Sequence, residues 1–381
     1  MSRAPTLPAL PIDDEPSDVA GLPPLGNLLE PPGLLRAFLA HPPQDFAAFV
    51  TCIGVPAFRA RFDLTTTADA ATRRLLERLP LYARWRELLR PRTCFVGTTV
   101  SEYAPLPRGR DAAAAVDALL QAHAPAQPFL IVKDIPQDSP LLGAADNRYA
   151  ADFAEACAAA GCVLLAGQAL AYVPIDFADT DAFLARLSHA RRRDIRRKLR
   201  ARADLEVEAL PTGADCFRDP QVLQHYYALY LAVYRQSEVH FDLLTPAFFR
   251  AVLQDAGSGG IVFAYRHAGR LIGWNLCYAH GGALIDKYVG FAYPEARAHN
   301  LYAVSWMHNL EYARARGLRH YVAGWTDPEV KAALGARFTF TRHAVYARSR
   351  ALRALLRRFA GRFESDRAWF EARPGAHAAD P

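Results

Sequence analysis

One segment decides the fold: residues 260–302, GIVFAYRHAGRLIGWNLCYAHGGALIDKYVGFAYPEARAHNLY. It contains three runs of strand-forming residues separated by short turns with glycine: 260–266, 271–278 and 283–289. Runs of this kind joined by tight turns predict an antiparallel meander. A helix is predicted next over residues 301–316, and a strand over residues 319–323. A meander followed by a helix and a strand is typical of an α/β fold, in which helices flank a mixed sheet.

The remaining chain has the composition of an ordinary globular protein. Hydrophobic residues make up 51% of the 381 residues and charged residues 22%, which argues against a disordered chain. The length predicts two or three domains. Strands and helices alternate in a similar order on both sides of a basic helix, so we expect two related α/β halves. The predicted parts are an irregular Pro-rich leader, two halves, and a basic helix with a polar tail: residues 1–45, 46–178, 179–350 and 351–381.

Several functional classes are disfavoured by what the sequence lacks. Six scattered cysteines form no C-x-x-C pair, and twelve histidines form no H-x-x-x-H pattern, so we expect no catalytic metal. No apolar run approaches the roughly eighteen residues of a membrane helix, so membrane insertion is not expected. The first residues lack the apolar region of a secretory signal, which predicts a cytoplasmic protein.

Positive charge is concentrated in one element. The net charge of the chain is +6, and residues 191–202, RRRDIRRKLRAR, contribute eight basic residues and one acidic residue. The rest of the chain is therefore close to neutral. This part of a predicted helix around residues 181–202 is either a solvated connector between the halves or a surface that binds the phosphates of a cofactor or of RNA.

The junction between the third strand and the following helix is the first candidate site. Free amides and the helix dipole make a helix N-terminus suitable for phosphate. Arg297 would add a charge-assisted contact, and Asn300 is a candidate N-cap before Leu301 and Tyr302. The alternative is a capped connection with an exposed arginine.

A second candidate lies on the strand itself. Asp286 and Tyr288 alternate with Lys287, which predicts that both face the same side. If Lys287 faces solvent, that side is the interior or a cleft. An aspartate beside a tyrosine would position an attacking amine or accept its proton. The alternative is a hydrogen-bonded pair at a strand edge.

Two further places carry polar residues that suit an acceptor site. Glu238 and His240 follow a tyrosine-rich helix and are candidates for a general base or for acceptor binding. Trp325 and Lys331 follow a strand at its C-terminal end, where open α/β sheets bind ligands. The chain has no G-x-S-x-G, Walker A or G-x-G-x-x-G motif, which leaves direct transfer without an enzyme nucleophile as the favoured chemistry.

Three motifs together resemble a known family. They are SHARRRDIRRKL (188–199) before a Leu-Glu-Val-Glu strand, Asn300-Leu-Tyr with NLEYARARGL (309–318), and Lys331-Ala-Ala-Leu-Gly335. They are similar to the GNAT-like domain of Fem-type peptidoglycan-bridge transferases and of their acyl-CoA-using relatives. The resemblance covers about residues 180–350, and more weakly residues 50–178 as a degenerate first GNAT-like half.

The resemblance implies tandem GNAT-like halves and N-acyl transfer from acyl-CoA, as co-substrate, to a small-molecule or peptide amine. It implies that a strand splays from its neighbour, and we expect this opening between residues 271–278 and 283–289. On this interpretation the pantetheine arm lies in the opening and the loop 291–302 binds the donor phosphates. The proposed roles are catalysis by Asp286, Tyr288 and Glu238, donor binding by Arg297, Asn300, Leu301 and Tyr302, and acceptor binding by His240, Trp325 and Lys331.

Two other interpretations stay open. The loop has no glycine between Pro294 and Tyr302, unlike the family's glycine-containing loop, and glycine eases close approach of a pyrophosphate. Fem-type members use aminoacyl-tRNA instead, and the basic helix would suit tRNA. The third possibility is a GNAT-shaped binding protein that has lost catalysis.

Overall fold

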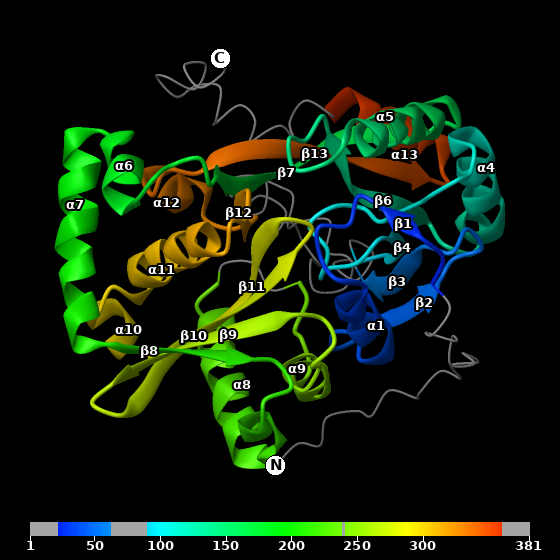
Figure 1. Cartoon of the computed structure of the whole chain (residues 1–381). Coiled ribbons are helices and arrows are strands. Elements are labelled where there is room, and N and C mark those ends of the chain that lie inside the picture. Colours follow the sequence, from blue (N-terminus) through cyan, green and yellow to red (C-terminus); the bar gives the residue numbers. More distant parts are fainter. Residues whose placement is uncertain (1–21, 62–89, 238–240, 360–381) are drawn as a thin grey trace, which may run out of the picture.

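The computed structural model describes residues 22–61, 90–237 and 241–359, and its centre is one large mixed sheet flanked by helices (Figure 1). This confirms the predicted α/β class. In spatial order the eleven strands are β2 (Ala47–Val50), β3 (Pro56–Arg61), β4 (Arg92–Val96), β6 (Phe129–Gln137), β13 (Arg337–Ala347), β7 (Val163–Pro174), β12 (His320–Gly324), β11 (Ala283–Phe291), β10 (Arg270–His280), β9 (Gly260–His267) and β8 (Glu206–Pro211). Strands β1 (Leu25–Gly26) and β5 (Leu106–Pro107) form a separate antiparallel pair.

The helices cover both faces of this sheet. They are α1 (Pro32–Ala40), α4 (Ala112–His123), α5 (Ala144–Ala159), α6 (Thr180–Ala185), α7 (His189–Leu199), α8 (Pro220–Tyr234), α9 (Pro246–Leu253), α10 (Glu295–Ala298), α11 (Leu301–Ala315), α12 (Pro328–Ala333) and α13 (Arg350–Phe359). Side-chain oxygens of Asp179, Ser188 and Thr245 accept hydrogen bonds from first-turn amides of α6, α7 and α9. The helix predicted around 181–202 is therefore two helices, because Ser188 starts a new one.

The two halves repeat one arrangement of strands and helices. The first repeat is β4–α4–β6–α5–β7, and the second is β11–α11–β12–α12–β13. In each repeat the first two strands are parallel neighbours. The last strands are exchanged, because β13 lies between β6 and β7 while β7 also pairs with β12. The tandem halves thus share one continuous sheet.

The leader is wrongly predicted as irregular over part of its length. Residues 32–40 form α1, whose Leu34, Leu35 and Phe38 are buried. Proline at the first helical positions is compatible with this helix because its missing N–H would have no intrahelical partner. Residues 1–21 of the leader lie outside the described part of the chain.

The meander is confirmed, but the predicted opening within it is wrong. Strands β10 and β11 stay paired from Gly273 opposite Phe291 to His280 opposite Ala283. The strand from which β11 separates is instead β12, its neighbour on the other side. These two strands pair only over residues 283–285 and 320–322. Residues 283–285 are buried, whereas 286–289 are partly exposed, so exposure of β11 begins where its pairing with β12 ends.

Helices cover both faces of the meander that borders this opening, and each forms a hydrophobic layer with it. Helix α11 packs on one face of the meander together with α6 and α7, and helices α8 and α9 pack on the other face with α1. Within the described ranges, no helix combines the length and apolar character that a membrane crossing requires.

Candidate active site

Asp286 lies at the point where β11 leaves β12, on the face covered by α11. Its carboxylate accepts hydrogen bonds from Asn275 of β10 at 3.2 Å, Asn309 of α11 at 3.0 Å and Tyr321 of β12 at 2.9 Å. Burial raises the pKa of Asp286, and the donated hydrogen bonds oppose that change. The carboxylate is therefore fixed in place by three elements rather than free to rotate.

Lys331 of α12 is a buried lysine whose charge interacts with that of Asp286. Its side chain is 3% exposed, and across the described ranges no hydrogen bond or ion pair reaches its Nζ atom. Burial lowers the pKa of Lys331 to about 8, and the charges of Glu102, Asp286 and Asp327 oppose the decrease. Lys331 Nζ lies 3.9 Å from the position that a Cβ would take at Gly324, the last residue of β12. This lysine, which has no partner among the described residues, therefore lies at the end of β12 that has parted from β11.

Lys287 forms a β-bulge that separates Asp286 from Tyr288. On β10, Cys277 faces Asp286 and Leu276 faces Tyr288, so Lys287 of β11 has no residue opposite it. A bulge turns the following side chains to the other face of the sheet. Tyr288 consequently packs edge-on against Phe249 at 5.5 Å, on the face away from Asp286. The prediction that Asp286 and Tyr288 share a face is wrong for this reason.

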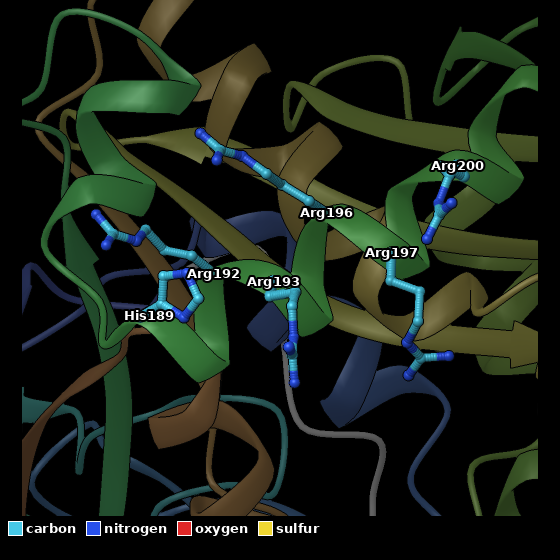
Figure 2. Close-up of a pocket in the computed structure, with 6 residues that line it drawn as sticks. All are labelled: His189, Arg192, Arg193, Arg196, Arg197 and Arg200. Carbon is cyan, nitrogen blue, oxygen red and sulfur yellow. The ribbon is translucent and has the colours of Figure 1, made fainter.

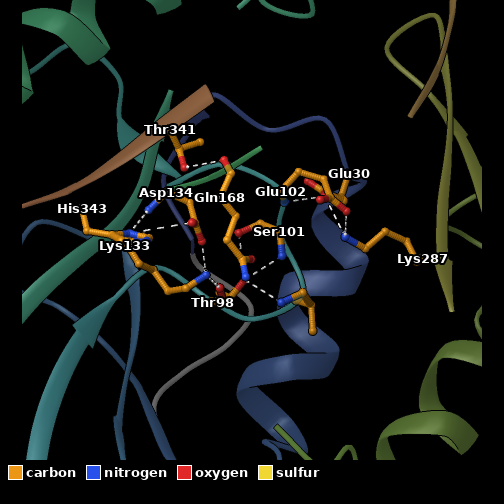
Figure 3. Close-up of polar contacts among 11 residues, drawn as sticks. Glu30, Thr98, Ser101, Glu102, Lys133, Asp134, Gln168, Lys287, Thr341 and His343 are labelled. Carbon is orange, nitrogen blue, oxygen red and sulfur yellow. Dashed lines mark hydrogen bonds and ion pairs between the residues drawn. The ribbon is translucent and has the colours of Figure 1, made fainter. Parts of the chain in front are cut away.

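Lys287 does not face solvent, contrary to the prediction. Its side chain is 6% exposed and lies between two buried glutamates, Glu30 of the leader and Glu102 of the first half (Figure 3). Its Nζ atom is 3.1 Å from Glu30 Oε1 and also pairs with Glu102, whose backbone N–H donates to the same Glu30 oxygen at 2.7 Å. Although burial alone would lower it, the two glutamates raise the pKa of Lys287 above its ordinary value.

The first repeat has a polar cluster in the equivalent place. Strands β4 and β6 pair as far as Val96 and Val132, and Lys133 and Asp134 follow. Lys133 contacts the Asp134 carboxylate, and the Asp134 amide donates to His343 Nδ1 at 3.0 Å (Figure 3). Both parallel pairs thus separate at charged residues. Sequence patterns did not single out these residues, nor Glu30, Glu102, Asn275 and Asn309.

The loop predicted to bind donor phosphates contains the four-residue helix α10. Arg297 is exposed, and its guanidinium donates to Gln236 at 2.8 Å. Asn300 takes the N-cap position of α11 in a left-handed conformation, with φ 51°, and its side chain makes no capping hydrogen bond. Leu301 is fully buried in the core. Burial, and to a smaller extent the charge of Asp286, raises the pKa of Tyr302.

The residues that were predicted to bind the acceptor do not lie together in one described site. Trp325 follows β12 and packs edge-on against Tyr103 of the first half, with ring centres 6.3 Å apart. Glu238 and His240 lie outside the described residues. In the ranges that are described, no group of three or more histidine, cysteine or acidic residues is arranged to hold a metal ion.

Helix α7 presents most of its arginines on one surface. It packs against α11 through the buried Ile195. Asp181 pairs with Arg196, and Asp194 pairs with Arg197 and Lys198. In the described part of the chain, Arg192, Arg193 and Arg200 have no acidic partner. A concavity of about 600 Å³ is lined by His189, Arg192, Arg193, Arg196, Arg197 and Arg200 (Figure 2).

The amino-acid sequence matches a known protein family over more than half of its length. The model of the FemAB-like family, described as peptidoglycan biosynthesis/recognition, matches residues 133–371. The chain belongs to the FemAB-like family. The match includes both exchanged strands, β7 and β13, and the whole second half. The resemblance inferred from the sequence motifs is thereby confirmed.

Two solved structures resemble the FemAB-like chain over most of its length. One is the C-terminal domain (DUF2156) of a putative lysylphosphatidylglycerol synthetase from Agrobacterium fabrum, with 16% identity, 86% of this chain and 90% of that chain covered, and a TM-score of 0.50. The other is FemX, with 13% identity, 88% and 95% covered, and a TM-score of 0.50. No curated protein sequence gives a significant match. Family and fold together point to a transferase of the GNAT-like class.

Proposed function

We propose that this FemAB-like protein is an aminoacyltransferase that moves an aminoacyl group from aminoacyl-tRNA to an acceptor amine. The observation that carries the proposal is Lys331, a buried lysine without a partner in the described residues, beside the opening between β11 and β12. A buried, unpaired cation is costly for a folded protein. Groups of this kind concentrate at functional sites.

The proposed reaction needs a fixed positive charge more than it needs a nucleophile. The neutral acceptor amine attacks the ester carbonyl, a C–N bond forms, and the ester C–O bond breaks. The ribose hydroxyl of tRNA leaves with the proton that the amine loses. Negative charge develops on the carbonyl oxygen, where the Lys331 ammonium would stabilise it. Asp286, held by three hydrogen bonds, favours the protonated form of Lys331.

The residues around the opening favour aminoacyl-tRNA over acyl-CoA as the donor. Acyl-CoA, which the sequence favoured, would place its pyrophosphate in the loop 291–302. That loop contains the short helix α10, and the Arg297 guanidinium donates a hydrogen bond to Gln236. Helix α7, in contrast, offers arginines without acidic partners in the described residues, on a helix that packs against α11. A polyanionic donor such as tRNA suits this surface better.

Charge reversal on α7 and at Arg200, which caps its C-terminal end, tests the donor. The triple variant Arg192→Glu, Arg193→Glu and Arg200→Glu is expected to weaken binding of aminoacyl-tRNA at least tenfold in a filter-binding assay. The slope of log K against log salt should decrease by about one for each lost phosphate contact. The control reverses three exposed arginines on other elements: Arg218, Arg314 and Arg358.

The result of a direct transfer assay decides between donors. Transfer of a labelled aminoacyl group from tRNA to an amine acceptor, lost in the triple variant and kept in the control, supports the proposal. Transfer from acyl-CoA that is equal in all three proteins, with tRNA binding unchanged, would show that the donor is wrong.

A further inference from the structure

The cluster of Glu30, Lys287 and Glu102 holds two carboxylates for one lysine. Both glutamates are nearly completely buried, at 0% and 2% exposure. Each uses one oxygen, Oε1, for Lys287, and each leaves its other oxygen, Oε2, buried without a hydrogen-bond partner among the described residues. An unsatisfied buried carboxylate oxygen is costly, so its presence in a folded chain calls for a ligand or a functional reason.

The position of the cluster relates it to the opening. Lys287 is the bulged residue directly after Asp286, at the start of the partly exposed segment of β11. Glu102 also acts on Lys331, and its negative charge opposes the decrease in the pKa of that lysine. Contacts connect the cluster to Lys331 as well. Tyr103, which follows Glu102 in the chain, packs against Trp325, and Lys331 Nζ lies 3.9 Å from the position that a Cβ would take at Gly324, the last residue of β12.

We propose that Glu30 and Glu102 bind the α-ammonium group of the aminoacyl donor. This inference rests on the proposed function. In an aminoacyl ester the α-ammonium is attached to the carbon next to the carbonyl, so a carbonyl held at Lys331 brings its ammonium close to that lysine. An ammonium has three N–H donors and one positive charge. It complements the two carboxylate oxygens that have no hydrogen-bond partner among the described residues.

This pairing would make the site selective for aminoacyl groups. A neutral acyl group, such as acetyl, supplies no positive charge and leaves both carboxylate oxygens unsatisfied. A site with buried polar groups rejects a ligand that lacks the matching group more strongly than a site with apolar walls does. Glu30 and Glu102 are thus assigned as specificity residues, which contact the donor away from the bond that breaks.

The competing explanation is that the cluster only clamps the two halves together. The two explanations differ in what happens when one glutamate becomes neutral. In Glu102→Gln, Lys287 keeps one carboxylate partner and the cluster becomes balanced in charge. A clamp would show no change in the binding of small amines, whereas an ammonium site would lose it.

The test measures binding of two amides to the full-length protein by NMR titration. They are L-alaninamide and propionamide, which has the same carbon skeleton without the ammonium group. We expect the wild-type protein to bind L-alaninamide at least tenfold more tightly than propionamide. Glu102→Gln and Glu30→Gln should both remove this preference. The control, Glu206→Gln on the exposed surface of β8, should retain it. Thermal unfolding verifies folding, and if Glu30→Gln does not fold, Glu102→Gln alone decides.

Equal binding of the two amides by wild-type protein, or an unchanged preference in folded Glu102→Gln, overturns the inference. Transfer assays with alanyl-tRNA and N-acetylalanyl-tRNA separate this failure from failure of the proposed function. If wild type and Glu102→Gln transfer both groups equally, the function stands and the ammonium site does not. If neither protein transfers either group, the function fails, and the amide titration still decides whether the ammonium site exists.

Discussion

Replacing Lys331 with methionine is expected to stabilise the protein while abolishing transfer. Methionine keeps the length and most of the apolar surface of lysine but carries no charge. The pKa of Lys331 is lowered from its ordinary value of 10.5 to about 8, which reflects the cost of keeping its charge buried. At 1.36 kcal/mol per pH unit, that difference corresponds to about 3 kcal/mol at neutral pH.

The pH dependence of this gain follows from which state binds the proton. Below pH 8 the lysine is charged in both the folded and the unfolded protein, so the folded state bears the full cost. Between pH 8 and 10.5 the unfolded chain still binds the proton and the folded protein does not, so wild-type stability rises relative to the variant. The advantage of Lys331→Met should therefore be complete at pH 7 and small near pH 10.

The assay is urea unfolding of both proteins at pH 7 and pH 9.5, with transfer measured in parallel. Lys198→Met, at a partly exposed position on α7, is the control and should change the unfolding free energy by less than about 0.5 kcal/mol. A Lys331→Met protein that is less stable than wild type at pH 7, or that is equally stabilised at both pH values, would refute the assigned environment. Retained transfer would refute the assigned role.

Three further outcomes are expected. Lys287→Met should lower the unfolding free energy by about 3–5 kcal/mol in urea, opposite in sign to Lys331→Met, because it leaves buried carboxylates uncompensated; equal stability would contradict the ion cluster. Asp286→Asn removes a charge that opposes the decrease in the pKa of Lys331, so the alkaline limb of the pH–rate profile, near pH 8 in wild type, should move to lower pH; an unmoved limb would exclude this coupling. Gly290→Ala should cost about 1–3 kcal/mol by thermal unfolding, because its Cβ would lie 2.2 Å from Trp274 Nε1; an unchanged midpoint would count against this packing.

Much of the second half is encoded in short stretches of sequence. The meander follows from strand-forming runs and from turns in which Ala268, Gly269, Gly281 and Gly282 adopt positive φ. The long helix after it was predicted to within one residue, at 301–316 against the observed Leu301–Ala315. These features depend on neighbours within a few positions, so local pattern suffices to predict them.

The candidate site was predictable only in part. Asp286 was found as a polar residue within a strand-forming run, and Lys331 was found because it follows the C-terminal end of a strand. The face of Tyr288 was mispredicted, because one bulged residue, Lys287, reverses the alternation of the strand. No period in the sequence marks a bulge, because it arises from the pairing of β11 with β10.

The amino-acid sequence by itself determined the α/β class, the meander and the family, because these depend on residue types at short spacing. Only the tertiary structure decided which strands part and which charges meet. Lys287 pairs with Glu30 across 257 positions and with Glu102 across 185, and β13 inserts between strands of the first half. Contacts at such separations result from the packing of the whole sheet, and a buried charge gains its partner only when that packing is complete.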